Sequence, residues 1–163
     1  MRLALREATR AADEGEVPAG CVIVVPPGDP HAGITSARII GRAHNQTELL
    51  KDATAHAEMI AITQAASALG DWRLTNTIMY VTKEPCPMCA GAIILARIPT
   101  VVYGVADPKR GGGTVFNIFN HPGLNHRPQV IPGILETACL SVLSDFFQAC
   151  RDGKIVKPGN KIR

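Results

Sequence analysis

The sequence predicts a single α/β domain in which helices pack against a sheet. Short apolar, strand-like runs alternate with helical patterns along the chain, and no internal repeat or linker interrupts them. The 163 residues, 46% apolar and 19% charged, have the composition of an ordinary globular protein. A chain of this length buries a core without help from disulfides.

The first third of the chain predicts a helix followed by two strands. Residues 1–14 carry apolar side chains near helical spacing and stop before Gly15, which indicates an amphipathic helix. The apolar runs 19–25 and 37–45 flank the turn-forming sequence PPGDP and predict a hairpin with a long, exposed loop.

The rest of the chain alternates helix and strand. Consecutive strands joined through helices require crossover connections, which favour a layered α/β domain. A polar, glycine-rich stretch with few periodic features covers 107–128. The predicted elements are helices at 54–69, 87–98 and 134–151, and strands at 77–82, 100–105 and in the sequence PQVIPG.

Composition also indicates a compartment. No apolar run approaches the roughly 20 residues that span a bilayer, and the first residues mix charges into a helical pattern. Five cysteines are an odd number in a chain without a secretion signal, which argues against a disulfide framework. We therefore expect a soluble cytoplasmic protein with reduced thiols and no membrane association.

Cys86 and Cys89 form a C-x-x-C pair at a predicted helix start. Pro87 suits the first helical position, so Cys86 is the expected cap and Cys89 lies one turn on, with both sulfurs near the positive end of the helix dipole. This position favours thiolates. The pair by itself is equally compatible with a redox dithiol and with half of a metal site.

The triplet His56-Ala57-Glu58 favours the metal site. It stands at another predicted helix start, and one imidazole with two thiolates makes the three protein ligands of a catalytic zinc, whose fourth position is left for water. Glu58, two residues from the histidine, can carry protons for hydrolysis. Singly, His56 is compatible with a core histidine and Glu58 with a first-turn carboxylate, but together with P-C-x-x-C they indicate a zinc enzyme.

The combination of H-x-E with P-C-x-x-C resembles the cytidine deaminase superfamily of zinc-dependent deaminases. The similarity extends to the bacterial tRNA adenosine deaminase family over roughly residues 1–151. It is carried, in order, by the segments GEVPAGCVIV, HNQ, DATAHAEMIAI, DWRL, MYVTKEPCPMCAGAII, ARIPTVVYGVADPK and FNHPGLNHR.

The resemblance implies a three-layer α/β/α cytidine-deaminase-like fold with a central mixed five-stranded sheet. It implies one Zn²⁺ per chain on His56, Cys86 and Cys89, with Glu58 as the catalytic proton carrier. The implied reaction is hydrolytic deamination of adenosine to inosine at the wobble position of a tRNA anticodon stem-loop, by a homodimer. The domain is expected at 1–151, with a basic tail at 152–163.

The resemblance also implies substrate-binding residues. Asn45 matches the residue that hydrogen-bonds the base, and the backbone near Ala57 borders the same pocket. For His121 and His126, a loop histidine paired with a backbone carbonyl is an equally good interpretation. The other expected substrate contacts are Glu84, Pro85, Asp107, Lys109, Arg110, Arg127 and Arg151.

The sequence departs from the family pattern at a few places. Lys83 stands where the family usually has a hydrophobic residue, and Ala53 stands where it usually has proline. The family's arginines after Phe147 are replaced by Gln148-Ala149-Cys150. From Gln148 onward the chain has one acidic residue, Asp152, and five basic ones, Arg151, Lys154, Lys157, Lys161 and Arg163. This tail either contacts phosphates or is a solvated terminus.

Three alternative functions stay open at this point. A guanine or other free-nucleobase deaminase shares the EPCPMC sequence. A redox protein would use Cys86 and Cys89 as its dithiol. A catalytically dead RNA-binding relative is disfavoured because Glu58 is present.

Overall fold

The computed structural model describes residues 1–28 and 36–155 of the chain. One five-stranded sheet has the order β2-β1-β3-β4-β5. β1 is antiparallel to both β2 and β3, whereas β3, β4 and β5 run parallel to one another. The strands are β1 (Gly20–Val25), β2 (Arg38–His44), β3 (Ile78–Lys83), β4 (Thr100–Val105) and β5 (Gln129–Ile131).

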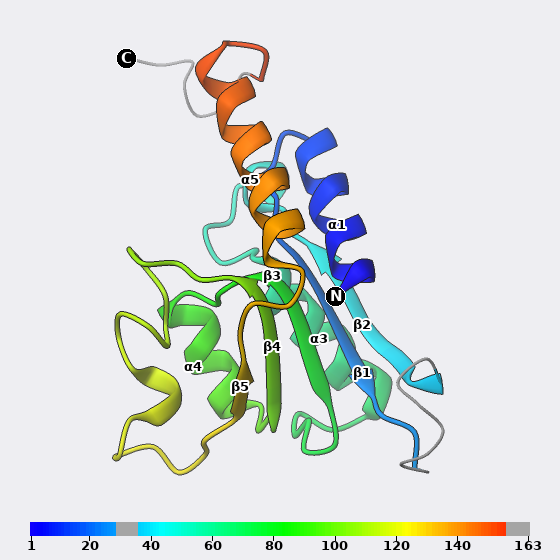
Figure 1. The fold of residues 1–163 in the computed structure, drawn as a ribbon. Coiled ribbons are helices and arrows are strands. Elements are labelled where there is room, and N and C mark those ends of the chain that lie inside the picture. Colours follow the sequence, from blue (N-terminus) through cyan, green and yellow to red (C-terminus); the bar gives the residue numbers. More distant parts are fainter. Residues whose placement is uncertain (29–35, 156–163) are drawn as a thin grey trace.

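Helices cover both faces of this sheet (Figure 1). α1 packs on β1 and β2, α5 packs on β4, and the two helices touch each other on one face; α3 packs on β1 and β2 from the other face, with α4 beside it. The predicted three-layer α/β/α fold with a mixed sheet is confirmed. The helices are α1 (Arg2–Asp13), α2 (Thr47–Leu50), α3 (Ala57–Leu69), α4 (Pro87–Leu95), α5 (Glu136–Arg151) and the 3₁₀ turn η2 (Ile118–Asn120).

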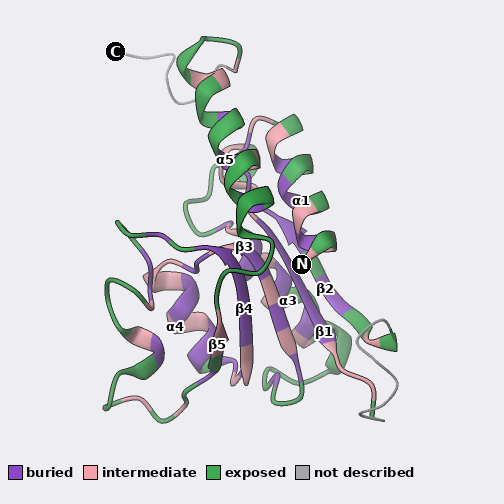
Figure 2. Ribbon diagram, in the orientation of Figure 1, coloured by how far each residue is buried: buried purple, intermediate pink, exposed green. Residues whose placement is uncertain are grey.

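The main hydrophobic core lies between the sheet and the layer of α3 and α4. Ile23, Met79 and Val101 from the strands meet Ala61 and Ile93 from the helices, and all five are buried. Figure 2 shows the same pattern, with buried residues concentrated in the central strands and on the inner sides of the helices. Apolar burial of this kind is the main force that fixes the layers.

All four predicted helices have shorter bounds in the structure, and α1 (Arg2–Asp13) loses only one residue at each end of the predicted 1–14. α3 begins at Ala57 rather than 54, because His56 has an extended backbone and serves as its cap. α4 ends at Leu95 rather than 98, since Arg97 has a left-handed φ of 61° that a helix does not accommodate. α5 begins at Glu136 rather than 134, because Leu135 has a φ of 57°.

The hairpin of 19–25 and 37–45 is present as the antiparallel pair β1–β2, with a register shift between Ile23 and Val24. The long loop expected between these strands includes residues 29–35, and the basic tail expected at 152–163 includes 156–163; both ranges lie outside the described residues. The short helix α2 was not predicted, because four residues carry no periodicity. Among the described helices, none is long and apolar enough to cross a membrane.

Candidate active site

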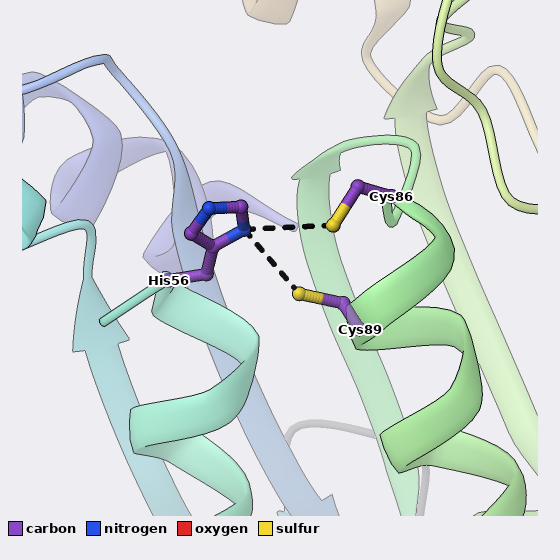
Figure 3. Close-up of side chains that lie close together, drawn as sticks. All are labelled: His56, Cys86 and Cys89. Atoms are coloured by element: carbon purple, nitrogen blue, oxygen red, sulfur yellow. Dashed lines mark hydrogen bonds between the residues drawn. The ribbon is translucent and has the colours of Figure 1, made fainter. Parts of the chain in front are cut away.

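His56, Cys86 and Cys89 come together at one edge of the sheet. α3 and α4 begin side by side there, with His56 as the cap of α3. Cys86 is the cap of α4 and Pro87 its first residue, as predicted. The imidazole points at both sulfurs (Figure 3). Its Nδ1 lies 3.6 Å from Sγ of Cys86 and 3.5 Å from Sγ of Cys89. All three donor atoms lie within 4.8 Å of one another.

This donor set fits a tetrahedral zinc ion. With Zn–N near 2.0 Å and Zn–S near 2.3 Å, tetrahedral geometry places the nitrogen and each sulfur roughly 3.5 Å apart. The two N···S separations in the structure match that spacing. Thiolate and imidazole are also the ligand types that select zinc over magnesium or calcium. Three protein ligands leave the fourth tetrahedral position free for a water molecule.

The pKa values of the two thiols shift in opposite directions. The thiol of Cys89 donates a hydrogen bond to Cys86, and His56 adds another, so the pKa of Cys86 falls to about 4 despite partial burial. The same hydrogen bond raises the pKa of Cys89. The hydrogen bond with Cys86 also raises the pKa of His56. The first turn of α4 therefore holds a thiolate that can bind a cation.

Glu58 lies in the first turn of α3 with its side chain buried. Burial raises its pKa above the usual value for a glutamate, although its own backbone hydrogen bond and the nearby His56 oppose that shift. A carboxyl with a raised pKa beside a hydrolytic centre is suited to accept and return a proton near neutral pH. Glu58 is thus placed to act on a substrate without being a metal ligand.

A cavity of about 220 Å³ opens onto this centre. It is smaller than the roughly 300–1,000 Å³ that drug-sized ligands occupy, which suits a single nucleobase. The carboxyl ends of the parallel strands β3 and β4 meet at this edge of the sheet, where α/β proteins commonly bind ligands. Its lining consists of Val17, Ala19, Asn45, Thr47, His56, Glu58, Lys83, Glu84, Cys86, Asp107 and Arg110.

The comparisons agree with this geometry. The sequence matches the MafB19-like deaminase family over residues 1–151. It is 44% identical over 155 residues to the tRNA-specific adenosine deaminase of Bacillus subtilis strain 168, an alignment that covers 94% of this chain and 90% of the relative. The chain belongs to the tRNA-specific adenosine deaminase family.

Two further comparisons extend the family assignment. The tRNA-specific adenosine deaminase of Aquifex aeolicus strain VF5 is 44% identical over 156 residues, which is 95% of this chain and 96% of the relative. A structure from biochemical and structural studies of A-to-I editing by tRNA:A34 deaminases superposes with a TM-score of 0.79 at 42% identity, covering 88% of this chain and 97% of the other. The resemblance stated from the sequence motifs is confirmed.

In this deaminase family member, Asn45 is held in one orientation at the pocket wall. Its amide nitrogen donates to the Glu16 carboxylate at 3.1 Å and to the Thr47 hydroxyl at 3.0 Å. Because a carboxylate only accepts hydrogen bonds, the nitrogen must face Glu16, and the amide oxygen is left for a ligand. Glu16, fully buried, also accepts from the Leu49 backbone N–H at 2.7 Å.

Glu84 and Pro85 shape the pocket through the loop that follows β4. The buried Glu84 carboxylate accepts hydrogen bonds from the backbone N–H groups of Asp107, Gly113 and Thr114 and from the Thr114 hydroxyl. The Pro85 carbonyl accepts from the backbone N–H of Gly112 at 2.8 Å. Ala57 is buried next to Glu58 and is the first residue of α3.

Glycine is required where this loop crosses Glu84. A Cβ at Gly111 would lie 2.3 Å from the Glu84 carboxylate oxygen, and one at Gly112 would lie 2.6 Å from Cβ of Ala90. The loop therefore approaches the site closely only because the segment 111–113 lacks side chains.

Asp107 anchors the turn at the pocket mouth. One carboxylate oxygen accepts from the backbone N–H groups of Lys109 and Arg110, and the other pairs with Lys83. Burial alone would raise the pKa of Asp107, but the hydrogen bonds from Lys83 and the two backbone N–H groups lower it overall. Arg110 lines the cavity, whereas Lys109 is exposed beside it.

Besides Ala57, Pro85 and Lys109, four more expected substrate contacts lie outside the cavity lining. His126 is paired with the Ile98 carbonyl at 2.7 Å, the bond expected of a loop histidine, and His121 accepts from the Gly123 N–H at 3.2 Å. Arg127 is exposed, with the Pro122 carbonyl at 3.4 Å. Arg151, at the end of α5, donates to Gln148. Their contact with RNA stays a prediction.

Sequence reasoning missed Glu16 and Thr47. Glu16 contacts Asn45 and Thr47 across 29 and 31 positions of the chain, which local periodicity does not reveal, and Thr47 in turn contacts Asn45 two positions away. The signal available was the position of Glu16 immediately after Gly15 and before a buried strand, inside the segment GEVPAG. An acidic residue that is buried at such a junction requires hydrogen-bond donors nearby.

Proposed function

We propose that this chain deaminates adenosine to inosine at the wobble position of a tRNA anticodon loop. One observation carries the proposal: Glu58 lines the same small cavity as His56 and Cys86, two members of the ligand set that the buried Cys89 completes. The named relatives, tRNA-specific adenosine deaminases that align over nearly the whole chain, support the choice of substrate.

Zinc on His56, Cys86 and Cys89 would lower the pKa of a coordinated water and so supply the nucleophile for hydrolysis. Glu58 would accept one proton of the attacking water and deliver it to the purine ring nitrogen. It would then pass the second proton of that water from the added hydroxyl to the amino group, so that the C6–N bond breaks, ammonia leaves and a carbonyl remains. Its raised pKa suits both directions of transfer. The buried amide of Asn45, fixed by Glu16, orients the base through its free oxygen.

A single-stranded loop is the appropriate substrate for this cavity. The reacting base has to leave its stack to enter a pocket of this size, and an unpaired loop base costs least to extract. The cations of Lys83 and Arg110 line the cavity, and Lys109 lies beside it, where the RNA backbone would pass. Arg127 and the tail beyond residue 151 are proposed to extend this contact along the stem-loop.

We further propose that the domain of residues 1–151 acts as a homodimer in the cytoplasm. Support for the dimer comes from an apolar groove on the layer of α3 and α4, where Trp72 is 53% and Leu95 71% exposed. Exposed apolar surface of this kind commonly marks an interface. The five free cysteines are compatible with a reducing compartment. Sedimentation equilibrium measures the oligomeric state directly.

Separate incubations with a tRNA anticodon stem-loop and with guanine test the proposed substrate. We expect ammonia release from the stem-loop and none from guanine. Release from guanine alone would favour the free-base deaminase instead. A redox protein would contain no stoichiometric metal and a freely titrating dithiol, so about one zinc per chain, removable only by a chelator, excludes that alternative.

A further inference from the structure

Lys83 is a charged residue of the motif MYVTKEPCPMC that has no part in the proposed chemical step. It is the last residue of β3 and pairs with Val105 of β4. Met79 and Val81 precede it on the same strand with side chains in the main core, and the alternation of a strand places Lys83 on that same face. A lysine that replaces an apolar residue at the end of a core-facing row needs a partner.

Its partner is Asp107, which follows the neighbouring parallel strand β4. The Lys83 ammonium forms an ion pair with one carboxylate oxygen of Asp107. The Lys83 side chain is 35% exposed and that of Asp107 only 11%, and both line the cavity. The pair is therefore partly buried at the mouth of the active site, where it matters more than a surface ion pair.

The other carboxylate oxygen of Asp107 fixes the turn that follows. It accepts the backbone N–H groups of Lys109 at 3.0 Å and Arg110 at 3.1 Å. Arg110 thereby reaches the lining of the cavity. Lys83, Asp107 and Arg110 form a continuous chain of contacts, so the lysine holds the carboxylate that in turn places the arginine.

The cavity that these contacts border is lined by several acidic residues. Glu58, Glu84 and Asp107 line it, and an RNA backbone approaching the mouth would meet their negative charge. Glu84 is enclosed by four hydrogen-bond donors, and Asp107 is the most exposed of the three acidic residues, at 8% against 5% for Glu58 and 2% for Glu84. The ammonium of Lys83 compensates that charge locally.

We propose that Lys83 is a positioning residue that neutralises Asp107 and holds the 107–110 turn, so that an anionic RNA backbone can approach the pocket. The inference rests on the proposed function, since it concerns a phosphate-bearing substrate. It assigns Lys83 no role in the chemical step, because the ammonium is engaged by the Asp107 carboxylate.

Steady-state kinetics of Lys83→Met on an anticodon stem-loop test the proposal. We expect KM to rise roughly tenfold while kcat stays within about twofold. The slope of the logarithm of the binding constant against the logarithm of salt concentration should change by about one. Lys83→Arg retains the ion pair and should restore KM. The control is Arg10→Met, which removes one positive charge and an ion pair with Glu14, neither residue belonging to the cavity lining, and which should leave KM unchanged.

The double variant Lys83→Met/Asp107→Asn distinguishes positioning from direct phosphate contact. Asparagine keeps the oxygen that accepts the N–H groups of Lys109 and Arg110 but removes the uncompensated charge. If Lys83 acts through Asp107, the second substitution returns KM to within about threefold of the wild type. A KM that stays as high as in Lys83→Met, or one that Lys83→Met never raised, overturns the inference. A wild-type chain that makes no inosine in the same assay refutes the proposed function itself.

Discussion

Replacing Glu84 with glutamine should loosen the wall of the active site and destabilise the fold. The carboxylate accepts from Gly113 N and Thr114 N through one oxygen, and from Asp107 N and the Thr114 hydroxyl through the other. A glutamine oxygen facing Gly113 and Thr114 keeps two of these bonds. Its NH₂ group then faces the Asp107 N–H, donor against donor.

The expected loss in the free energy of unfolding follows from the hydrogen bonds that the variant keeps and loses. One buried, unpaired N–H costs about 1–3 kcal/mol, and changing a charged acceptor to a neutral one weakens each retained bond by about 0.5–1 kcal/mol. The hydroxyl of Thr114 can rotate to accept from the new amide, which limits the loss. Glutamine carries no charge, so the variant avoids the free-energy penalty of burying a carboxylate, and this offsets part of the lost stability. We predict a loss of about 2–4 kcal/mol in the free energy of unfolding.

Urea unfolding followed by circular dichroism measures this loss. With a slope near 2 kcal/mol/M, the midpoint should fall by roughly 1–2 M without a change in slope. Glu136→Gln, on an exposed residue at the start of α5, is the matched control and should cost less than about 1 kcal/mol. A Glu84→Gln midpoint indistinguishable from that control would refute the reasoning that this carboxylate holds the loop.

Three other predictions concern the metal, the proton carrier and the tail. Glu58→Gln should retain zinc and the fold, as measured by metal analysis and circular dichroism, but lose at least about 10²-fold in kcat, because it removes only proton transfer; near-normal turnover would contradict this. Cys86→Ala should contain far less than one zinc per chain, and full zinc content would exclude the cysteine as a ligand. Truncation after Arg151 should weaken tRNA binding and flatten its salt dependence, whereas unchanged binding would mean that the tail is only solvated.

The sequence predicts the local features of the fold well, because strand alternation, helix caps and turn residues are encoded by neighbours. Pro87 marks the start of α4, and Gly70 the end of α3. The grouping of the candidate metal ligands was predictable for a different reason. Thiolates, an imidazole and a nearby carboxylate occur together chiefly in catalytic zinc sites. This combination indicated that His56 and Cys86 meet, although 30 residues separate them in the sequence.

The contacts that tune the site were not predictable in this way. Lys83 forms an ion pair with Asp107, and Glu84 accepts hydrogen bonds from the loop at 111–114. Each pairing depends on the register of β3 against β4. Many residue types could satisfy a lysine or a glutamate, so sequence alone does not select the partner. Helix ends set by left-handed residues such as Leu135 were missed because leucine seldom adopts that conformation.

In the proposed function, the ligand set of His56, Cys86 and Cys89 acts together with Glu58 on the wobble base of tRNA. Sequencing of position 34 in tRNA incubated with the zinc-loaded chain tests it most directly, because inosine is read as guanosine. We predict conversion of adenosine to guanosine reads at that position with the wild type and none with Glu58→Gln. Adenosine that stays unconverted with the zinc-loaded wild type, or that is converted equally by Glu58→Gln, would contradict the account.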